Sequence, residues 1–147
     1  VRSYLDRLIE VSSKPLSVIE TCFATDMSGV RTNNFTSWFS IRTGKQIRKR
    51  DHLASHITTG VKSNIVTAVD VCVKKGKDNE IMRQHVDRTS TNFKIKEWSG
   101  DSMYWAKANC NKVVEAGGKP YFKPKKSWCG KSRGCMIWKK KLCRANA

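Results

Sequence analysis

From residue 21 of this chain of 147 residues, the apolar residues first have the spacing of strands, and helical spacing begins near Asp78. Three β-prone runs come first, at residues 21–27, 52–59 and 64–73, and the loop over residues 60–63 has the composition of a hairpin turn. From Asp78 onward, helical spacing alternates with short strands. Consecutive strands followed by alternating helix and strand predict one mixed sheet, with an antiparallel side and a parallel side reached through helical crossovers.

The second half of the chain supplies these crossovers. Its expected elements are a helix from residue 78 with Asp78 or Asn79 as its N-cap, a strand over residues 93–98, a helix over about residues 103–116 and a strand from residue 119. His85 lies on the apolar stripe of the first helix, which predicts a hydrogen-bonded, partly buried side chain. An aromatic segment at residues 35–42 adds a short strand. We therefore expect an α/β fold with a mixed sheet of about five strands and flanking helices.

The two ends of the chain differ from this core. Residues 1–11 show the stripe of an amphipathic helix, which the Lys-Pro pair at residues 14–15 is expected to end. The predicted organisation is a helical segment over residues 1–20, a folded core over residues 21–125 and a basic tail over residues 126–147. The chain begins with valine and shows no signal-peptide pattern, so we expect a fragment. No run reaches the roughly 18 apolar residues that a membrane span needs.

Positive charge dominates the composition. The chain has 29 lysines and arginines against 12 aspartates and glutamates, which gives a net charge of +17 and a pI of about 10.0. Such a field attracts phosphate backbones, and the aromatic residues among the C-terminal lysines, such as Trp128 and Trp138, could stack on unpaired bases. The residues expected to contact DNA are Arg42, Lys45, Arg48, Lys49, Arg50, Lys123, Lys125, Lys126, Lys131 and Arg133.

The six cysteines favour free thiols over a disulfide framework. Cys22, Cys72 and Cys110 lie in apolar stretches, where a thiol behaves as a small buried hydrophobe. The other three, at positions 129, 135 and 143, do not have the spacing of a usual zinc site. We therefore expect a reduced, cytoplasmic protein. The alternative left open is a secreted cationic protein held together by disulfides.

Two aspartates stand out in a chain that otherwise attracts anions. Asp26 is expected to end a strand that is buried on both faces, and Asp101 is expected to follow the strand over residues 93–98. A carboxylate repels a phosphate unless a divalent cation lies between them, and Mg2+ and Mn2+ prefer carboxylate oxygens. The simpler interpretation is that Asp26 caps a turn and Asp101 caps the following helix. Spacing alone leaves both interpretations open.

The sequence around both aspartates resembles a known family. Three blocks are similar to the DDE transposases of prokaryotic insertion sequences: residues 23–29 (FATDMSG), the hairpin over residues 52–73, and the run over residues 100–125. The last block is the most specific, because it joins Gly-Asp-x-x-Tyr to a helix, a Gly-Gly stop and a basic strand that contains proline. The resemblance extends from about residue 21 to the end. It implies a ribonuclease-H-like fold in which Asp26 and Asp101 bind two Mg2+ or Mn2+ ions.

The activity that this resemblance implies is DNA transposition. Two metal ions roughly 3.5–4 Å apart would activate the attacking oxygen and stabilise the leaving oxygen during in-line displacement at a phosphodiester. Water attacks first and a DNA 3′ hydroxyl second, so a transposon end is nicked and then joined to target DNA. The implied partners are double-stranded DNA and a second copy of the chain, in the cytoplasm of a prokaryote.

The third metal ligand of the family is a glutamate on a later helix. No acidic residue follows Glu115 in this sequence. Glu115 itself lies about four turns beyond Asp101, where we expect it to point to solvent. The expectation is therefore a C-terminally truncated catalytic domain that is inactive alone.

The remaining candidates have simpler explanations. His52 and His56 lie four positions apart on an expected strand, too far apart to share a metal. Asp70 is expected to be a hydrogen-bonded strand acid rather than an additional ligand. The alternative function is a basic DNA-binding module without catalysis, in which Asp26 and Asp101 are only caps.

Overall fold

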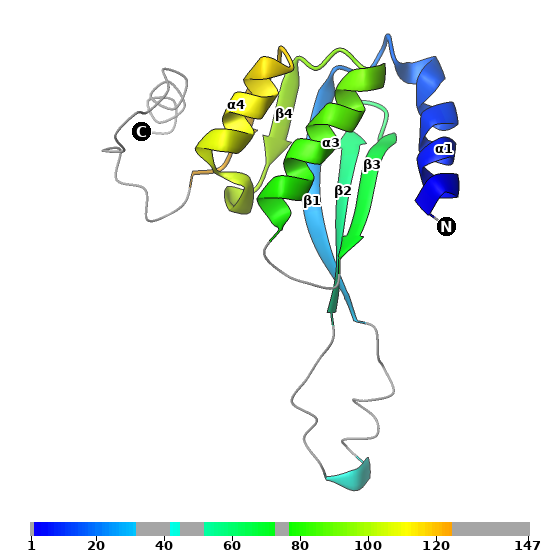
Figure 1. Ribbon diagram of the computed structural model, residues 1–147, viewed down its shortest axis with the longest axis vertical. Helices are drawn as coiled ribbons and strands as arrows, with labels where there is room; N and C mark the ends of the chain where they lie inside the picture. Colours follow the sequence, from blue (N-terminus) through cyan, green and yellow to red (C-terminus); the bar gives the residue numbers. More distant parts are fainter. Residues whose placement is uncertain (1, 32–41, 45–51, 73–76, 125–147) are drawn as a thin grey trace.

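The computed structural model describes residues 2–31, 42–44, 52–72 and 77–124. They contain a five-stranded sheet with the order β3-β2-β1-β4-β5 (Figure 1). The strands are β1 (Cys22–Arg31), β2 (His52–Gly60), β3 (Val66–Cys72), β4 (Glu97–Gly100) and β5 (Lys119–Phe122). β2 pairs antiparallel with β1 and β3, whereas β4 pairs parallel with β1 and β5. The predicted α/β fold with a mixed sheet is confirmed, and its strand order is consistent with a ribonuclease-H-like arrangement.

Two helices cover one face of the sheet. α3 (Asp78–Asn92) connects β3 to β4, and α4 (Lys107–Glu115) connects β4 to β5, so both crossovers return on the same face (Figure 1). A third helix, α1 (Arg2–Ser13), precedes the 3-10 turn η1 (Lys14–Leu16) and contacts β3 at the edge of the sheet. None of the described helices is long and apolar enough to cross a membrane.

The core lies between the sheet and the layer of α3 and α4. Phe23, Trp98 and Phe122 each provide a fully buried ring from one of the three parallel strands. The helices add Met82, Val86, Cys110 and Val113 to the same cluster. We call this side the covered face. Alternate residues of a strand point to opposite sides, so the intervening residues of β1, β4 and β5 form a second face, the open face.

β1 and β4 differ from their expected bounds. β1 does not end at Asp26 but continues to Arg31, because its antiparallel pairing with β2 extends that far. It is also not buried on both faces, since Asp26 and Ser28 are exposed. β4 begins at Glu97 rather than at residue 93, because α3 runs to Asn92 and the connection after it is not part of the sheet.

The helix ends differ in smaller ways. Lys77 is the N-cap of α3, and no side-chain cap bond is present; Asp78 and Glu80 instead lie in the first turn, where the helix dipole favours carboxylates. The helix expected over residues 103–116 is divided into the 3-10 turn η2 (Ser102–Tyr104) and α4. Within the strand expected at residues 35–42, only Arg42 belongs to the described residues.

A buried carboxylate ties the start of β1 to the predicted β2–β3 hairpin. Glu20 accepts hydrogen bonds of 2.9–3.1 Å from the backbone N–H groups of residues 21, 22, 62 and 63 and from the Ser63 hydroxyl. Burial raises the pKa of Glu20, but the hydrogen bonds from Ser63, Cys22 and Lys62 lower it, and the net shift is downward. A Cβ on Gly60 would lie 2.5 Å from Glu20 Cγ, so the hairpin needs glycine there.

Candidate active site

Asp26 and Asp101 follow the last paired residues of two neighbouring parallel strands. β1 and β4 are paired up to Thr25 and Gly100, and Asp26 and Asp101 are the next residues after these two strand positions. Asp101 keeps an extended backbone, with φ −73° and ψ −176°, so it continues the direction of β4. Neighbouring strands lie about 4.8 Å apart. The sheet therefore brings together the two aspartates that the sequence singled out.

Both aspartates belong to the open face. Thr25 is buried on the covered face, so the next residue, Asp26, projects to the other side. Asp101 follows Gly100 in the same way, and both aspartates are exposed. The described helices do not cover this face, because α3 and α4 lie on the opposite side and α1 lies at the β3 edge (Figure 1). A ligand can approach the two carboxylates from this side of the described sheet.

Each aspartate uses one carboxylate oxygen in local structure. Oδ1 of Asp26 accepts a hydrogen bond from the Met27 N–H, and Oδ1 of Asp101 accepts one from the Met103 N–H, both at 2.8 Å. Asp101 is thus the N-cap of η2, as the simpler interpretation predicted, whereas Asp26 lies inside a strand and caps no turn. Within the described residues, Oδ2 of both carboxylates remains available. Adjacent, exposed carboxylate oxygens are suitable ligands for a hard divalent cation.

Gly100 makes room for the ring that follows the second aspartate. A Cβ on Gly100 would lie 3.0 Å from the Phe122 ring and 3.1 Å from the Tyr104 ring. Glycine at this position therefore allows both rings to pack beneath the end of β4. This contact gives a physical reason for the spacing of Gly100, Asp101 and Tyr104 in the sequence block.

Tyr104 is buried close to both aspartates. Its hydroxyl lies 3.3 Å from Nδ1 of His56 on β2. Burial raises the pKa of Tyr104, and the negative charges of Asp101, Asp78 and Asp26 raise it further. The hydroxyl therefore keeps its proton. Sequence reasoning assigned no role to Tyr104 or His56, and the only signal for their contact was the position of the tyrosine in the Gly-Asp-x-x-Tyr block.

Lys123 extends the row of charged residues across the sheet. β4 and β5 are paired up to Gly100 and Phe122, and the Lys123 N–H donates a hydrogen bond of 3.3 Å to the Gly100 carbonyl. Phe122 is buried on the covered face, so the exposed Lys123 follows it toward the open face. Asp26, Asp101 and Lys123 are thus the first residues after the parallel paired segments of β1, β4 and β5. A lysine at this edge of the sheet is placed to neutralise a phosphate that approaches the open face.

The structure describes two of the ten residues expected to contact DNA. Arg42 and Lys123 are both exposed. The other eight lie outside the described residues: Lys45, Arg48, Lys49, Arg50, Lys125, Lys126, Lys131 and Arg133. The DNA interface therefore stays a prediction.

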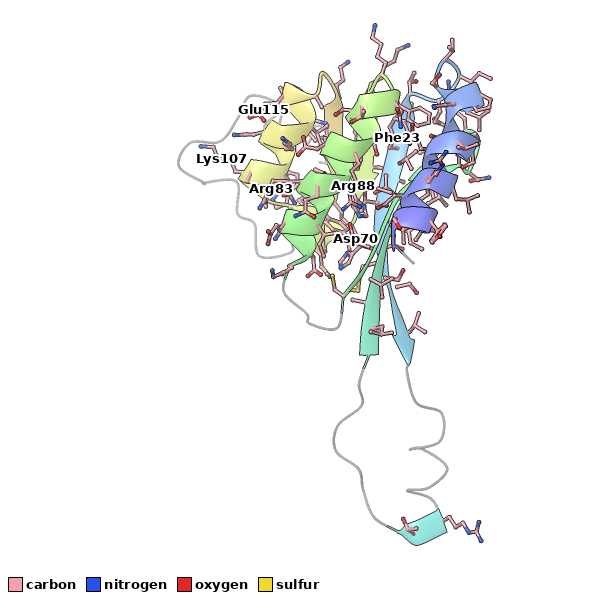
Figure 2. All side chains as sticks on the ribbon, turned by 45° about the vertical axis from the view of Figure 1, so that its right-hand side comes forward. Phe23, Asp70, Arg83, Arg88, Lys107 and Glu115 are labelled. Carbon is pink, nitrogen blue, oxygen red and sulfur yellow. The ribbon has the colours of Figure 1, made fainter. Side chains whose placement is uncertain are left out.

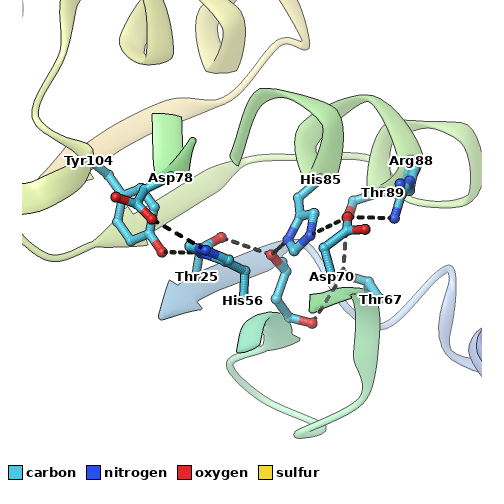
Figure 3. Close-up of polar contacts among 10 residues, drawn as sticks. Thr25, His56, Thr67, Asp70, Asp78, His85, Arg88, Thr89 and Tyr104 are labelled. Carbon is cyan, nitrogen blue, oxygen red and sulfur yellow. Dashed lines mark hydrogen bonds and ion pairs between the residues drawn. The ribbon is translucent and has the colours of Figure 1, made fainter. Parts of the chain in front are cut away.

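A second polar cluster lies under β2 and β3 (Figure 3). His85 of α3 is fully buried, with Nε2 3.1 Å from Asp70 Oδ2 and Nδ1 2.8 Å from the Thr58 hydroxyl. Burial lowers the pKa of His85 to about 4, against the opposing effect of Asp70. Arg88 donates to the same Asp70 oxygen at 2.9 Å. Asp70 is therefore a hydrogen-bonded strand acid, as predicted, and His85 is buried more deeply than expected.

Other sequence predictions can also be compared with the structure. Cys22, Cys72 and Cys110 are free thiols, and Cys110 is fully buried, whereas the other two are half-buried. Glu115 is exposed at the end of α4, opposite the end that begins at Lys107 and follows η2 (Figure 2). Its position agrees with the expectation that it points to solvent.

The described residues contain no group of three or more His, Cys, Asp or Glu side chains that could hold a metal ion. No protein-family model matches the chain, and no curated protein matches it. The structure shows the α/β fold with its mixed sheet. Membership of the transposase family stays a prediction from the sequence blocks.

Proposed function

We propose that the chain is part of a DNA transposase in which Asp26 and Asp101 bind a divalent cation for phosphodiester cleavage and strand transfer. The observation that supports this proposal is the register that makes the two aspartates neighbours on parallel strands. Like charges on adjacent strands repel each other, and both carboxylates also repel a DNA backbone. A bound cation removes both repulsions.

The residues of the site would have distinct roles in this reaction. The carboxylates of Asp26 and Asp101 would hold Mg2+ or Mn2+, which supplies activation of the attacking oxygen and stabilisation of the leaving oxygen. Lys123 would neutralise a phosphate oxygen beside the metal, and Arg42 with the other basic residues would bind the DNA backbone. The open face would be the side that DNA approaches.

Two aspartates provide an incomplete ligand set for two ions. The third ligand implied by the resemblance is a glutamate, and no acidic residue follows Glu115 in this sequence. The proposal for this chain is therefore cation and DNA binding, with weak or no strand cleavage by the chain alone. Synapsis of two transposon ends would require a homodimer acting on DNA in the prokaryotic cytoplasm.

Thermal unfolding with and without Mn2+ tests this proposal. A cation that binds only the folded chain raises Tm, and EDTA reverses the shift. We expect Asp26→Asn and Asp101→Asn each to remove the Mn2+ shift. Glu115→Gln is the matched control, because it removes another exposed acid while the shift should remain. Equal Mn2+ shifts in the three variants and the natural chain would overturn the proposed cation site.

A basic DNA-binding module without catalysis is the second candidate, and the net charge of +17 favours it. Both candidates predict salt-dependent duplex binding. This measurement therefore identifies the residues that contact DNA, but it does not distinguish a transposase from a binding module. Lys123→Ala should reduce the slope of log affinity against log salt by about one, the loss of a single phosphate contact. Lys94→Ala is the control, since Lys94 is exposed before β4, at the opposite end from Asp101. Duplex binding with no Mn2+ shift would favour the module.

A further inference from the structure

Tyr104 is anchored at both its hydroxyl and its backbone. The hydroxyl lies 3.3 Å from Nδ1 of His56, and the backbone carbonyl accepts a hydrogen bond of 3.0 Å from Nδ2 of Asn109 on α4. Tyr104, His56 and Asn109 are each at most 1% exposed. The Tyr104 N–H also donates to the Asp101 carbonyl at 3.3 Å, within η2. Fixing Tyr104 therefore fixes the turn that carries the Asp101 carboxylate.

The hydroxyl contact continues to the first turn of α3. Nε2 of His56 lies 3.3 Å from Oδ1 of Asp78 (Figure 3). A carboxylate only accepts hydrogen bonds, so the His56–Asp78 contact requires a proton on Nε2. In the tautomer with its single proton there, Nδ1 accepts from the Tyr104 hydroxyl. Asn109 reaches the same turn, because its Nδ2 also donates to Oδ1 of Asn79 at 2.7 Å. Two polar links thus join the turn after Asp101 to the start of α3.

His56 lies on the covered face of the sheet, on the strand next to Asp26. His56 is paired with Met27, the residue after Asp26, in the register of β1 and β2. Its side chain is buried on the covered face, whereas Asp26 projects from the open face. The Tyr104–His56 contact therefore connects the backbone beside one aspartate with the turn beside the other.

We propose that Tyr104 and His56 are positioning residues that fix the Asp101 carboxylate relative to Asp26 for cation binding. This inference rests on the proposed function, because it concerns the same two carboxylates. Neither residue touches the cation. They act by holding η2, whose first hydrogen bond is the one that Asp101 Oδ1 accepts from Met103.

The affinity of the full chain for Mn2+, measured from the electron paramagnetic resonance signal of free Mn2+, tests the inference. Tyr104→Phe removes only the hydroxyl and keeps the ring against Gly100, and we expect about tenfold weaker binding, as for other residues that orient metal ligands. His56→Leu should weaken binding similarly. His56→Gln should recover most of the affinity, because its amide can accept from Tyr104 and donate to Asp78.

His85→Leu is the matched control. His85 is also a buried histidine held by two side-chain hydrogen bonds, but its partners Thr58 and Asp70 do not lead to η2. This variant should lose stability and keep its Mn2+ affinity. If Tyr104→Phe and His56→Leu weaken Mn2+ binding no more than His85→Leu does, the inference is wrong and the cation site remains. If the natural chain binds Mn2+ no more tightly than Asp26→Asn, the cation site is wrong, and the inference fails with it.

Discussion

The polar side chains on the two faces of the sheet differ in their partners: those on the covered face contact one another, and those on the open face contact solvent. On the covered face, the Thr25 hydroxyl lies 2.8 Å from the Thr58 hydroxyl, which lies 2.8 Å from His85, and His85 contacts Asp70. On the open face, Asp26 and Asp101 are exposed, and each accepts one backbone hydrogen bond. The described residues show no ion pair to either aspartate. These side chains of the covered face pair with one another, although the buried Nε1 of Trp98 has no hydrogen-bond partner in the described structure. The open face leaves the charges of Asp26 and Asp101 to solvent.

Burial explains this difference. A buried polar group without a partner costs about 1–3 kcal/mol, whereas water satisfies an exposed one at no comparable cost. The directions of the covered network follow from this requirement: His85 Nε2–H donates to Asp70, so Nδ1 accepts from Thr58, whose oxygen accepts from Thr25. The covered face therefore determines stability. The open face can hold adjacent carboxylates at little cost to folding, because water solvates them.

The largest expected effect is the loss of Asp70 from the covered face. Asp70→Ala removes the partner of both the buried His85 Nε2–H and Arg88. The His85 Nε2–H left without a partner costs about 1–3 kcal/mol, and losing the partly exposed ion pair with Arg88 costs up to about 1 kcal/mol more. Urea unfolding should show a fall in the free energy of unfolding near this range. A loss below about 1 kcal/mol would mean that the covered network contributes no more than surface contacts do.

Gly100 and Ser99 are neighbours on β4 but face opposite sides of the sheet, so substitutions there compare the two faces within one strand. Gly100→Val should destabilise the chain by about 1–3 kcal/mol, because added side-chain atoms would overlap the Phe122 and Tyr104 rings. Ser99 projects to the open face, and its hydroxyl donates to the Phe23 carbonyl at 3.2 Å. Ser99→Val should cost about 1 kcal/mol or less, the value of that hydrogen bond. Similar losses of Tm in the two variants would contradict the assignment of faces.

The sheet could be predicted from sequence because its signals are local. The change of spacing near Asp78 marks the step from hairpins to crossovers, and the glycine at residue 60 marks the hairpin turn. The length of β1 could not be predicted in this way. Beyond Asp26, Ser28 and Gly29 interrupt the apolar pattern, and glycine is depleted in strands. These residues form a strand because they pair with β2, and the sequence of β1 alone does not show that pairing.

The candidate site was predictable only in part for the same reason. Asp26 and Asp101 each follow an apolar run, which a local pattern can mark. The contact between His56 and Tyr104 joins residues that are 48 positions apart, and that of Thr58 with His85 joins residues 27 apart. Such pairs depend on strand register and helix placement. Spacing along the chain gave His56 no assignable role.

The pH dependence of stability tests the covered face. The folded-state pKa of His85 is about 4, below the ordinary value of 6.5, so the unfolded chain binds a proton in this interval while the folded chain does not. The contribution of His85 is therefore complete above pH 6.5 and is lost as the pH falls toward 4. Over the two units below pH 6.5 the loss should approach about 2–3 kcal/mol. His85→Gln should flatten this part of a urea-unfolding profile, and an unchanged slope would contradict the assignment.

The smallest expected effect is on the open face. Asp26→Asn keeps the size of the side chain and removes the repulsion from Asp101. Without metal, the free energy of unfolding should therefore change by less than about 0.5 kcal/mol, and we expect the change to be a small increase. Asp101→Asn should behave similarly, because asparagine also caps a helical turn, whereas Asp101→Ala should lose about 1 kcal/mol of capping. Urea unfolding in EDTA measures all three. A loss above about 1 kcal/mol for Asp26→Asn would make Asp26 a stabilising group and remove the contrast between the faces, because a carboxylate that stabilises the unliganded fold has a structural reason to be there and needs no ligand to explain it.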